Sequence, residues 1–224
     1  MDVGQDAEQL VEDHQEPEAQ MPAGTWTTWK VIGVAVAVAV VAVVLALLLA
    51  DRFSVPAEDS VDVGFLHDMT DHHEQAIRMA VLGVENAEDI EIQRYAREVI
   101  IAQQWDIGYM SALLDEWGLG RGDPDRDTMV WMDMPTSVEN MPGMASTEDF
   151  EAFVDAQGAE ADAWFLQLMT EHHRGGIHMA EEAATTASDR RVRDLAAQME
   201  AGQRAELREY ALAAQRLGID LDPS

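Results

Sequence analysis

The chain has 224 residues and no cysteine, and its 43 acidic and 14 basic side chains give a formal net charge of −29. This balance excludes nucleic acid as a main partner, because a polyanion repels another polyanion. It also disfavours docking on anionic lipid headgroups. The lack of cysteine excludes disulfides, thiolate metal sites and a cysteine nucleophile. The apolar share of 47% is typical of a globular protein.

Two segments precede the expected globular region. Residues 1–30 hold seven acidic side chains and few large apolar groups, which predicts a disordered acidic tail. Residues 31–50 then carry no charge, and a helix of that length spans the roughly 30 Å hydrocarbon core of a membrane. Trp26 and Trp29 stand just before this run, where indoles favour the membrane interface. We therefore expect one transmembrane anchor, followed by a linker over residues 51–59.

A cleaved signal peptide is the alternative interpretation of the apolar run. The run exceeds the usual signal core of about 7–15 residues, and no basic region precedes it. No Ala-x-Ala site closes it, since Ala46 and Ala50 are four positions apart. We expect an uncleaved anchor. Lys30 on one side and Arg52 on the other leave almost no charge bias, so the basic residues do not predict its orientation.

The strongest pattern in the chain is an internal repeat at an offset of 100 residues. Phe65–Ala80 and Phe165–Ala180 are identical at nine of sixteen positions, where about one match is expected by chance. The register continues without a gap into a second segment, in which Asp106 aligns with Glu206. These two carboxylates are expected at equivalent inward positions of the second helix of each unit. The chain therefore contains a duplicated two-segment unit.

Apolar residues recur at steps of three and four in both units, which predicts helices throughout. The expected helices lie at about 60–86, 88–118, 148–186 and 189–218. Short links within each unit imply antiparallel hairpins, and one long crossover joins them. The predicted fold is all-α: a ferritin-like four-helix bundle built from a duplicated helical hairpin and preceded by one transmembrane helix. The bundle covers residues 60–218, with repeats at about 60–118 and 148–218, a Met-rich crossover at 119–147 and a tail at 219–224.

Each repeat carries two adjacent histidines between methionines. On a helix, Met69 and Met79 share one face with His72 and His73, because the spacings are three, four and seven residues. The second repeat has the same arrangement in Met169, His172, His173 and Met179. If the units pack face to face, four imidazoles and four thioethers converge. Thioethers select soft ions, so this set favours copper, and Cu(I) in particular, over zinc or another divalent metal.

Two other classes of function stay open. Inward methionines are usually core filler, and the histidines could form a structural polar layer on a module that binds a cationic partner. In that case the imidazoles would bond to nearby acids, namely Asp68, Asp71, Glu74 or Glu171. A metal-dependent redox enzyme is the other alternative. We expect no enzyme and name no catalytic residue, because no nucleophile, oxyanion hole or phosphate loop is marked.

Ferritin-like di-iron chemistry fits poorly, because it needs Glu-x-x-His motifs. Methionine or threonine stands three residues before each paired histidine. The crossover holds a second group of soft side chains, whose alternative role is to plug one end of the bundle with Trp131: Met129, Met132, Met134, Met141 and Met144. His67 and His178 break the repeat and are expected to be peripheral, and His14 to be incidental.

The doubled Phe-Leu-x-x-Met-x-x-His-His-x-x-x-Ile-x-Met-Ala pattern and the Met-Pro-Gly-Met stretch at 141–144 resemble the bacterial domain of unknown function 305. The resemblance covers about residues 60–218. It implies a ferritin-like, outward-facing domain that is exported or membrane-anchored, and the few studied family members are associated with copper binding and tolerance. The metal-site residues that it carries over are Met69, His72, His73, Met79, Met169, His172, His173 and Met179, followed by Met141 and Met144.

One departure from the repeated pattern lies beside the site. The second unit has Gly175-Gly176 where the first has Gln75-Ala76, which is expected to loosen that helix. Taken together, the residues and the resemblance predict a single-pass cell-membrane protein with an extracytoplasmic domain that binds copper for metal buffering or tolerance. No protein partner is indicated.

Overall fold

The structure is a computed structural model that describes residues 24–52 and 55–221 and forms two compact units, residues 1–54 and 55–224. Most of the expected acidic tail, part of the linker and the last three residues lie outside the described residues. His14 lies there too.

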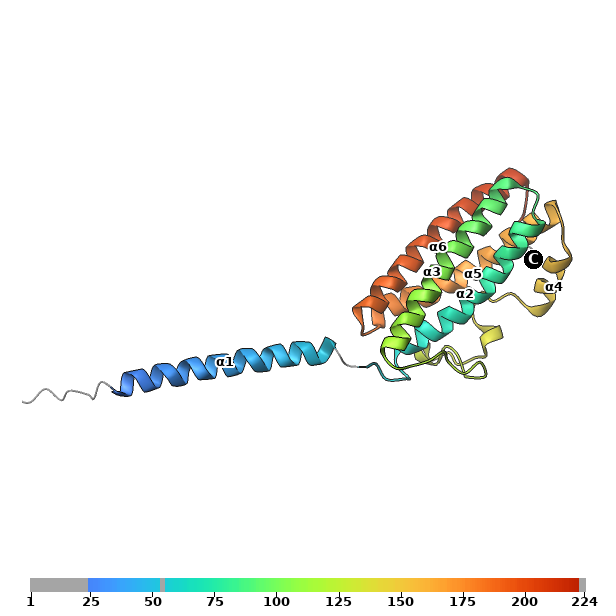
Figure 1. Cartoon of the computed structure of the whole chain (residues 1–224). Coiled ribbons are helices and arrows are strands. Elements are labelled where there is room, and N and C mark those ends of the chain that lie inside the picture. Colours follow the sequence, from blue (N-terminus) through green and yellow to red (C-terminus); the bar gives the residue numbers. More distant parts are fainter. Residues whose placement is uncertain (1–23, 53–54, 222–224) are drawn as a thin grey trace, which may run out of the picture. The chain divides into compact units, whose positions relative to one another are not determined.

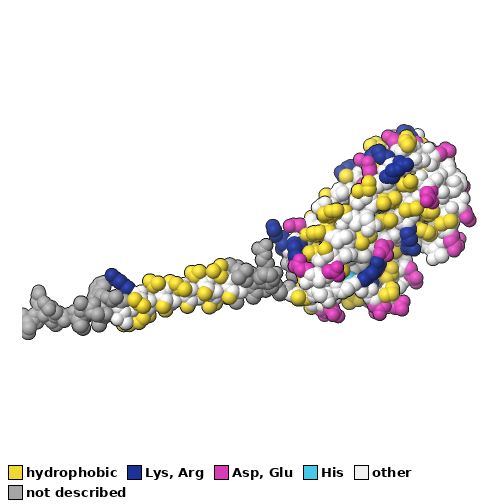
Figure 2. All heavy atoms as spheres, viewed as in Figure 1, with side chains coloured by type: hydrophobic (Ala, Val, Ile, Leu, Met, Phe, Trp, Pro, Cys, Tyr) yellow, Lys and Arg dark blue, Asp and Glu magenta, His cyan; other side chains and the backbone are white. Residues whose placement is uncertain are grey.

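The described part of the first unit is one helix, α1 (Gly24–Arg52), drawn in blue in Figure 1. It begins before residue 31, so residues 24–30 of the expected tail are helical. Thr28–Ala46 has a mean hydropathy of 2.5 and exposes its apolar side chains (Figure 2). By length and composition this stretch could cross a membrane, as an anchor or as a signal sequence.

The second unit is all-α, as the periodicity predicts, and its described residues form no β-strand. Two short 3-10 turns interrupt the crossover, at Val130–Met132 and Val138–Asn140. The α-helices of this unit are α2 (Val61–Asn86), α3 (Ile90–Glu116), α4 (Thr147–Asp155), α5 (Ala159–Thr186) and α6 (Arg190–Leu217).

The expected single helix over residues 148–186 is wrong, because α4 and α5 replace it. Gly158 separates them with φ 61° and ψ −134°, a backbone conformation outside the helical region. The Gly158 N–H donates a hydrogen bond of 2.9 Å to the Asn86 carbonyl at the end of α2. This contact fixes the start of α5 beside the first hairpin, while the short α4 packs outside the bundle (Figure 1).

Helices α2 and α5 lie together at the centre of the bundle, with α3 packed on α2 and α6 on α5 (Figure 1). One apolar cluster joins the start of α2 to the end of α5, through Phe65 and Ala183. A second cluster joins the end of α2 to the start of α5, through Ala80 and Phe165. The two central helices therefore run antiparallel, and the paired histidines lie between the two clusters.

Two buried carboxylates hold the hairpin turns across the repeats. Asp62 on α2 accepts hydrogen bonds from the N–H groups of Ser188 and Asp189, at 3.0 and 2.7 Å. Its counterpart 100 residues later, Asp162 on α5, accepts one from the Asp89 N–H at 3.1 Å. Each repeat thus anchors the turn of the other, which sets the register of α2 against α5 at the level of the histidines.

Candidate metal centre

Four histidines form a buried layer between the central helices. His72 and His73 on α2 and His172 and His173 on α5 are all 0% exposed. The rings of His72 and His172 face each other with centroids 3.7 Å apart and a tilt of 34°. The His172 and His173 centroids are 6.4 Å apart. The structure thus brings together all four histidines that the repeat singles out, and we call them the His layer.

The outer two histidines are hydrogen-bonded to carboxylates. Nε2 of His73 lies 3.3 Å from a carboxylate oxygen of Asp106 on α3. Nε2 of His173 lies 2.6 Å from a carboxylate oxygen of Glu206 on α6. Both carboxylates belong to the repeat, 100 residues apart. The acids expected to satisfy a polar layer were Asp68, Asp71, Glu74 and Glu171, and the structure gives that role to Asp106 and Glu206 instead.

The inner two histidines are hydrogen-bonded to backbone carbonyls. Nε2 of His72 donates to the carbonyl of Pro142 in the crossover, at 3.1 Å. Nε2 of His172 donates to the backbone carbonyl of His72, at 2.9 Å. A carbonyl can only accept a hydrogen bond, so the proton of each neutral ring lies on Nε2. The lone pair of each ring is then left on Nδ1.

All four Nδ1 atoms of the His layer are buried and have no hydrogen-bond partner. A buried acceptor without a partner costs about 1–3 kcal/mol, and such atoms are uncommon in native proteins. The same pattern is typical of metal sites, in which a ligating histidine binds the ion through one nitrogen and donates from the other to a carboxylate or carbonyl. The donor set of the layer therefore fits a metal ion.

Burial keeps the inner rings neutral. Desolvation, reinforced by the neighbouring His73, lowers the pKa of His72 to about 3. Desolvation, reinforced by the other three histidines, holds the pKa of His172 well below its usual range. At neutral pH both rings keep the lone pair that a metal ion requires.

The methionines of the two motifs lie above and below the His layer. All four are fully buried. Met69 and Met179 belong to the apolar cluster at one end of the bundle, and Met79 and Met169 belong to the cluster at the other end. The four thioethers therefore form two pairs. Each pair contains one methionine from the first repeat and one from the second, and the imidazoles lie between the two pairs.

The Met141–Met144 stretch of the crossover covers the inner histidines. Gly143 has φ 82°, and a Cβ on it would lie 2.5 Å from the Glu171 carbonyl oxygen. A Cβ on Gly175 would lie 1.9 Å from the Pro142 carbonyl oxygen. The expected loosening of α5 at Gly175-Gly176 is therefore wrong. The helix is unbroken there, and Gly175 leaves the space that lets the crossover reach His72.

The crossover methionines differ in burial. Met129 and Met141 join the apolar cluster at one end of the bundle, Met132 and Met144 are partly buried against it, and Met134 is 49% exposed. Trp131 packs edge-on against Phe65 and donates from its indole N–H to Asp68 at 2.8 Å. Met129, Met141 and Trp131 thus plug one end of the bundle.

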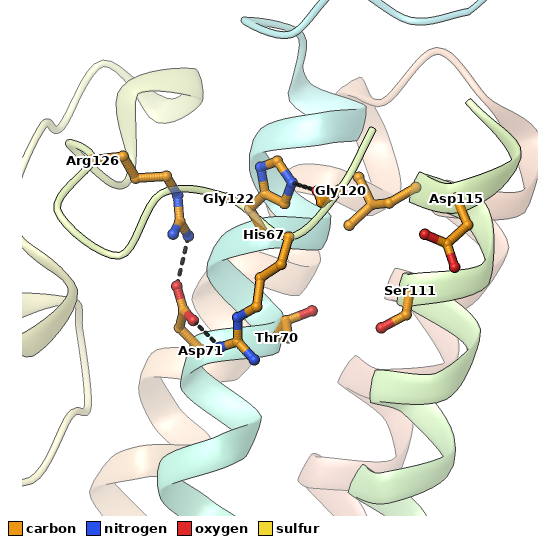
Figure 3. Close-up of a pocket in the computed structure, with 10 residues that line it drawn as sticks. His67, Thr70, Asp71, Ser111, Asp115, Gly120, Gly122 and Arg126 are labelled. Atoms are coloured by element: carbon orange, nitrogen blue, oxygen red, sulfur yellow. Dashed lines mark hydrogen bonds and ion pairs between the residues drawn. The ribbon is translucent and has the colours of Figure 1, made fainter. Parts of the chain in front are cut away.

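His67 lines a separate pocket of about 180 Å³, shown in Figure 3. Its Nε2 is bonded to the Gly120 carbonyl at 3.0 Å, and Asp71 lies between Arg126 and a second arginine, Arg121. The pocket includes none of the four histidines of the layer. The polar groups of this pocket bond the crossover to α2. His178 is exposed on α5, so neither His67 nor His178 belongs to the His layer.

A groove of about 380 Å³ between α3 and α6 reaches the His layer from the surface. His73, Asp106 and Glu206 line it. The histidine and methionine motifs do not indicate this groove, because its walls come from residues on the outer helices. Ala102 on α3 is exposed and also lines the groove.

Carboxylates and imidazoles alone do not complete a metal site. Within residues 24–52 and 55–221, no three side chains of His, Asp or Glu converge closely enough to hold an ion. A metal ion bound in the layer therefore needs donors of another kind, and the buried thioethers of the two motifs are of a kind that a soft ion accepts.

Comparisons with known proteins identify relatives over most of the second unit. The family model described as "Domain of unknown function (DUF305)" matches residues 62–212. A DUF305 protein from Streptomyces coelicolor, described as a candidate secreted protein, is 34% identical, with a TM-score of 0.70 over 75% of this chain and 100% of its own. A DUF305 fragment from Deinococcus radiodurans is 26% identical, with a TM-score of 0.60 over 70% and 96% of the two chains.

CopM in its Cu(I)-bound form is 24% identical, with a TM-score of 0.51 over 69% of this chain and 96% of its own. At that identity the likeness concerns the fold. No curated protein matches the chain.

Proposed function

The chain belongs to the DUF305 family, and from that premise we propose that it is a membrane-anchored, extracytoplasmic copper-binding protein. It binds copper as Cu(I), through the His layer and the methionines beside it, and serves in metal buffering or tolerance. Copper is the cargo of this protein, and no catalytic step is assigned to it.

The observation that carries this proposal is the state of the four imidazoles. Each Nε2 is bonded to an oxygen, and each Nδ1 is buried without a partner. A purely structural layer would leave four buried nitrogens without a hydrogen-bond partner, at a cost of several kcal/mol. A metal ion bound through Nδ1 removes that cost, and the oxygens bonded to Nε2 hold each ring in the required tautomer.

The methionines favour a soft ion. Thioether sulfur selects Cu(I), whereas a carboxylate-rich site would favour harder ions. Met69 and Met179 on one side of the layer, and Met79 and Met169 on the other, offer buried sulfur to an ion bound by the rings. One relative in fold is consistent with this choice, because CopM has been solved with Cu(I), with Cu(II) and with silver bound.

The proposed location depends on α1 and on a relative. Thr28–Ala46 is apolar enough to cross a membrane, and the Streptomyces coelicolor relative is described as a candidate secreted protein. We assign α1 as an uncleaved single-pass anchor and the DUF305 domain to the extracytoplasmic side. The chain as a whole has a net charge of −29, and an acidic excess of this kind raises the local concentration of cations around the protein.

A structural polar layer is the second candidate, and one observation favours it. His73 and His173 are bonded to Asp106 and Glu206, which is what such a layer requires. The two candidates differ in their treatment of Nδ1: the metal site uses this atom, and the polar layer leaves it without a role. A metal-dependent enzyme would use the α3–α6 groove as its substrate pocket, and no serine, threonine, cysteine, lysine or tyrosine side chain is among the residues that line that groove.

Anaerobic titration with Cu(I) in the presence of a chromogenic chelator tests the proposal. The full-length protein in detergent is compared with a variant in which His72, His73, His172 and His173 are all glutamine. We expect tight binding by the natural protein and a loss of about 100-fold or more in affinity in the variant. Circular dichroism confirms that the helices persist.

The matched control replaces the two peripheral histidines, His67 and His178, by glutamine. This control removes imidazoles from the same helices without touching the His layer, so it should bind Cu(I) as the natural protein does. Equal affinity in all three proteins would show that the layer is structural. Binding no stronger than that of the chelator background would contradict the copper assignment itself.

A further inference from the structure

The His layer is closed on one side and approached by a groove on the other. On the closed side, the Pro142 carbonyl is bonded to His72, and Gly143 packs against the backbone of His172. Helix α5 fits this loop so closely that a Cβ on Gly175 would overlap it. An ion could pass here only if the crossover left its position.

The opposite side carries the α3–α6 groove, whose volume is about 380 Å³. His73 is one of its lining residues although its side chain is 0% exposed, so the floor of the groove is the edge of the layer itself. Asp106 and Glu206, the carboxylates bonded to the outer histidines, line the walls. An ion in the groove would therefore already be in contact with the groups that orient the ligands.

The lining of the groove suits a soft cation on its way to the imidazoles. Met199 lines the groove and is 4% exposed, and its counterpart in the first repeat is Val99. Gln103 and Gln203 also line it, and each has a buried carboxamide oxygen without a hydrogen-bond partner. The lining of the groove thus offers sulfur, carboxylate oxygens and amide oxygens beside His73.

Small residues keep the groove open. Ala102 on α3 and Gly202 on α6 occupy equivalent positions of the two repeats and both line it. A Cβ added to Gly202 would meet no atom within 4 Å. At the rim, Ile101 is 72% and Trp105 is 55% exposed. A larger side chain at position 202 would therefore extend into open space.

We propose that the groove between α3 and α6 is the route by which the copper ion reaches and leaves the His layer, with Met199 as a sulfur donor along it. This inference rests on the proposed function, which it deepens by assigning access to the site. An obstacle in such a route changes neither the free nor the loaded state. It therefore slows uptake and release by the same factor and leaves the equilibrium affinity unchanged.

The experiment compares single substitutions in the full-length protein. Gly202→Phe fills the groove and leaves every proposed ligand in place. Gly108→Phe is the matched control, because Gly108 is also a helical glycine with no atom within 4 Å of an added Cβ, and it does not line the groove. Trp105→Ala removes a large side chain from the rim, and it keeps the proposal testable if the new phenylalanine disturbs the packing.

Stopped-flow mixing of the Cu(I)-loaded protein with excess chromogenic chelator gives the rate of release, and chelator competition at equilibrium gives the affinity. We expect Gly202→Phe to slow release about tenfold or more at unchanged affinity, Gly108→Phe to match the natural protein, and Trp105→Ala to release faster. Unchanged rates in both groove variants, with Cu(I) still bound, would overturn the route alone. Failure of the natural protein to bind Cu(I) would overturn both proposals.

Discussion

The two repeats share their histidines and methionines but differ where they meet the crossover, which the chain contains only once. Position 75 is glutamine, and its side chain forms hydrogen bonds with the N–H and the carbonyl of Ala145, at 2.7 and 3.0 Å. Position 175 is glycine, and the Pro142 carbonyl takes the space of its missing side chain. Both residues position the same loop: the glutamine binds it through hydrogen bonds, and the glycine leaves room for it. Residues that match between the repeats thus form the His layer, and these two residues that differ allow the crossover to pack over it.

A second difference concerns the outer face of the layer. Thr70 on α2 donates to the Leu66 carbonyl at 2.6 Å and lies 3.8 Å from the Met110 sulfur. In the second repeat Tyr210 replaces Met110, and the hydroxyls of Thr170 and Tyr210 are both buried without a partner. The Tyr210 ring lies 5.5 Å from the His173 ring. The hydroxyl beside the first half of the layer thus has a hydrogen-bond partner, whereas the two hydroxyls beside the second half have none.

Acid should destabilise the folded protein through the buried histidines that the two repeats share. In the apo protein the pKa of His72 is about 3 against 6.5 for an ordinary histidine, and the pKa of His172 is lowered too. As the pH falls below 6.5, the unfolded chain binds protons at these two histidines and the folded protein does not. Their contribution to the free energy of unfolding is therefore fully present above pH 6.5 and decreases as the pH falls towards 3. We expect a loss of about 1.4 kcal/mol per pH unit for each such histidine.

Urea denaturation at several pH values between 7.5 and 5 measures this loss, above the range in which ordinary carboxylates titrate. The variant His72→Gln should show a shallower slope, because one of the two buried groups is removed. A free energy of unfolding that stays constant over this range would contradict the account of two neutral, buried imidazoles.

A methyl group at position 175 should break the asymmetry at the crossover. The Cβ of Gly175→Ala would lie 1.9 Å from the Pro142 carbonyl oxygen, and we expect a loss of about 3 kcal/mol in the free energy of unfolding from this overlap. Gly202→Ala is the control, since its Cβ meets open space and should stabilise α6 by about 0.5–1 kcal/mol. Effects of the same sign in the two variants would refute the close approach.

The carboxylates should differ in their effect on copper affinity. His173 and Glu206 are 2.6 Å apart, whereas His73 and Asp106 are 3.3 Å apart. Glu206→Gln keeps an acceptor oxygen but removes the charge, and we expect it to lower Cu(I) affinity about 10- to 100-fold. Asp106→Asn should lower it less. An equal or reversed order in chelator competition would show that these bond lengths do not govern the ligands.

The smallest expected effect comes from the unpartnered hydroxyl of Tyr210. Tyr210→Phe removes a buried polar atom that has no hydrogen bond, and we expect the free energy of unfolding to rise by about 1 kcal/mol. Tyr95 provides the control, because its ring contacts Tyr210 at 5.5 Å and its hydroxyl is not among the buried atoms without a partner. Tyr95→Phe should leave the urea midpoint nearly unchanged, and equal shifts in the two variants would contradict this explanation.

The all-α fold and the buried histidines followed from periodicity and from the repeat, because both depend on positions close together in the sequence. The break at Gly158 did not, since the glycine gains its conformation from a contact with Asn86 more than 70 residues away. The carboxylates of Asp106 and Glu206 could be placed only on the inward face. Which ring each one binds depends on how α3 and α6 pack.

The crossover was the least predictable part. Its prolines and glycines indicated a loop, but nothing local to Pro142 shows that its carbonyl accepts from His72, 70 residues away. The pair Gly175-Gly176 was expected to loosen α5 because helix propensity was the only local signal. The tertiary contact with Pro142 gives Gly175 the opposite role, since it allows the loop to close over the layer.

The central claim is that Nδ1 of the layer histidines is the free ligand atom, and nitrogen-15 NMR tests it most directly. Long-range proton–nitrogen spectra of full-length protein with labelled histidines would be recorded without metal and after anaerobic addition of Cu(I). The account predicts that the rings of His72 and His172 are neutral and protonated at Nε2 before addition, and that the Nδ1 resonances of the layer shift afterwards while Nε2 stays protonated. Protonation at Nδ1 in the apo protein, or Nδ1 resonances that do not respond to Cu(I), would contradict it.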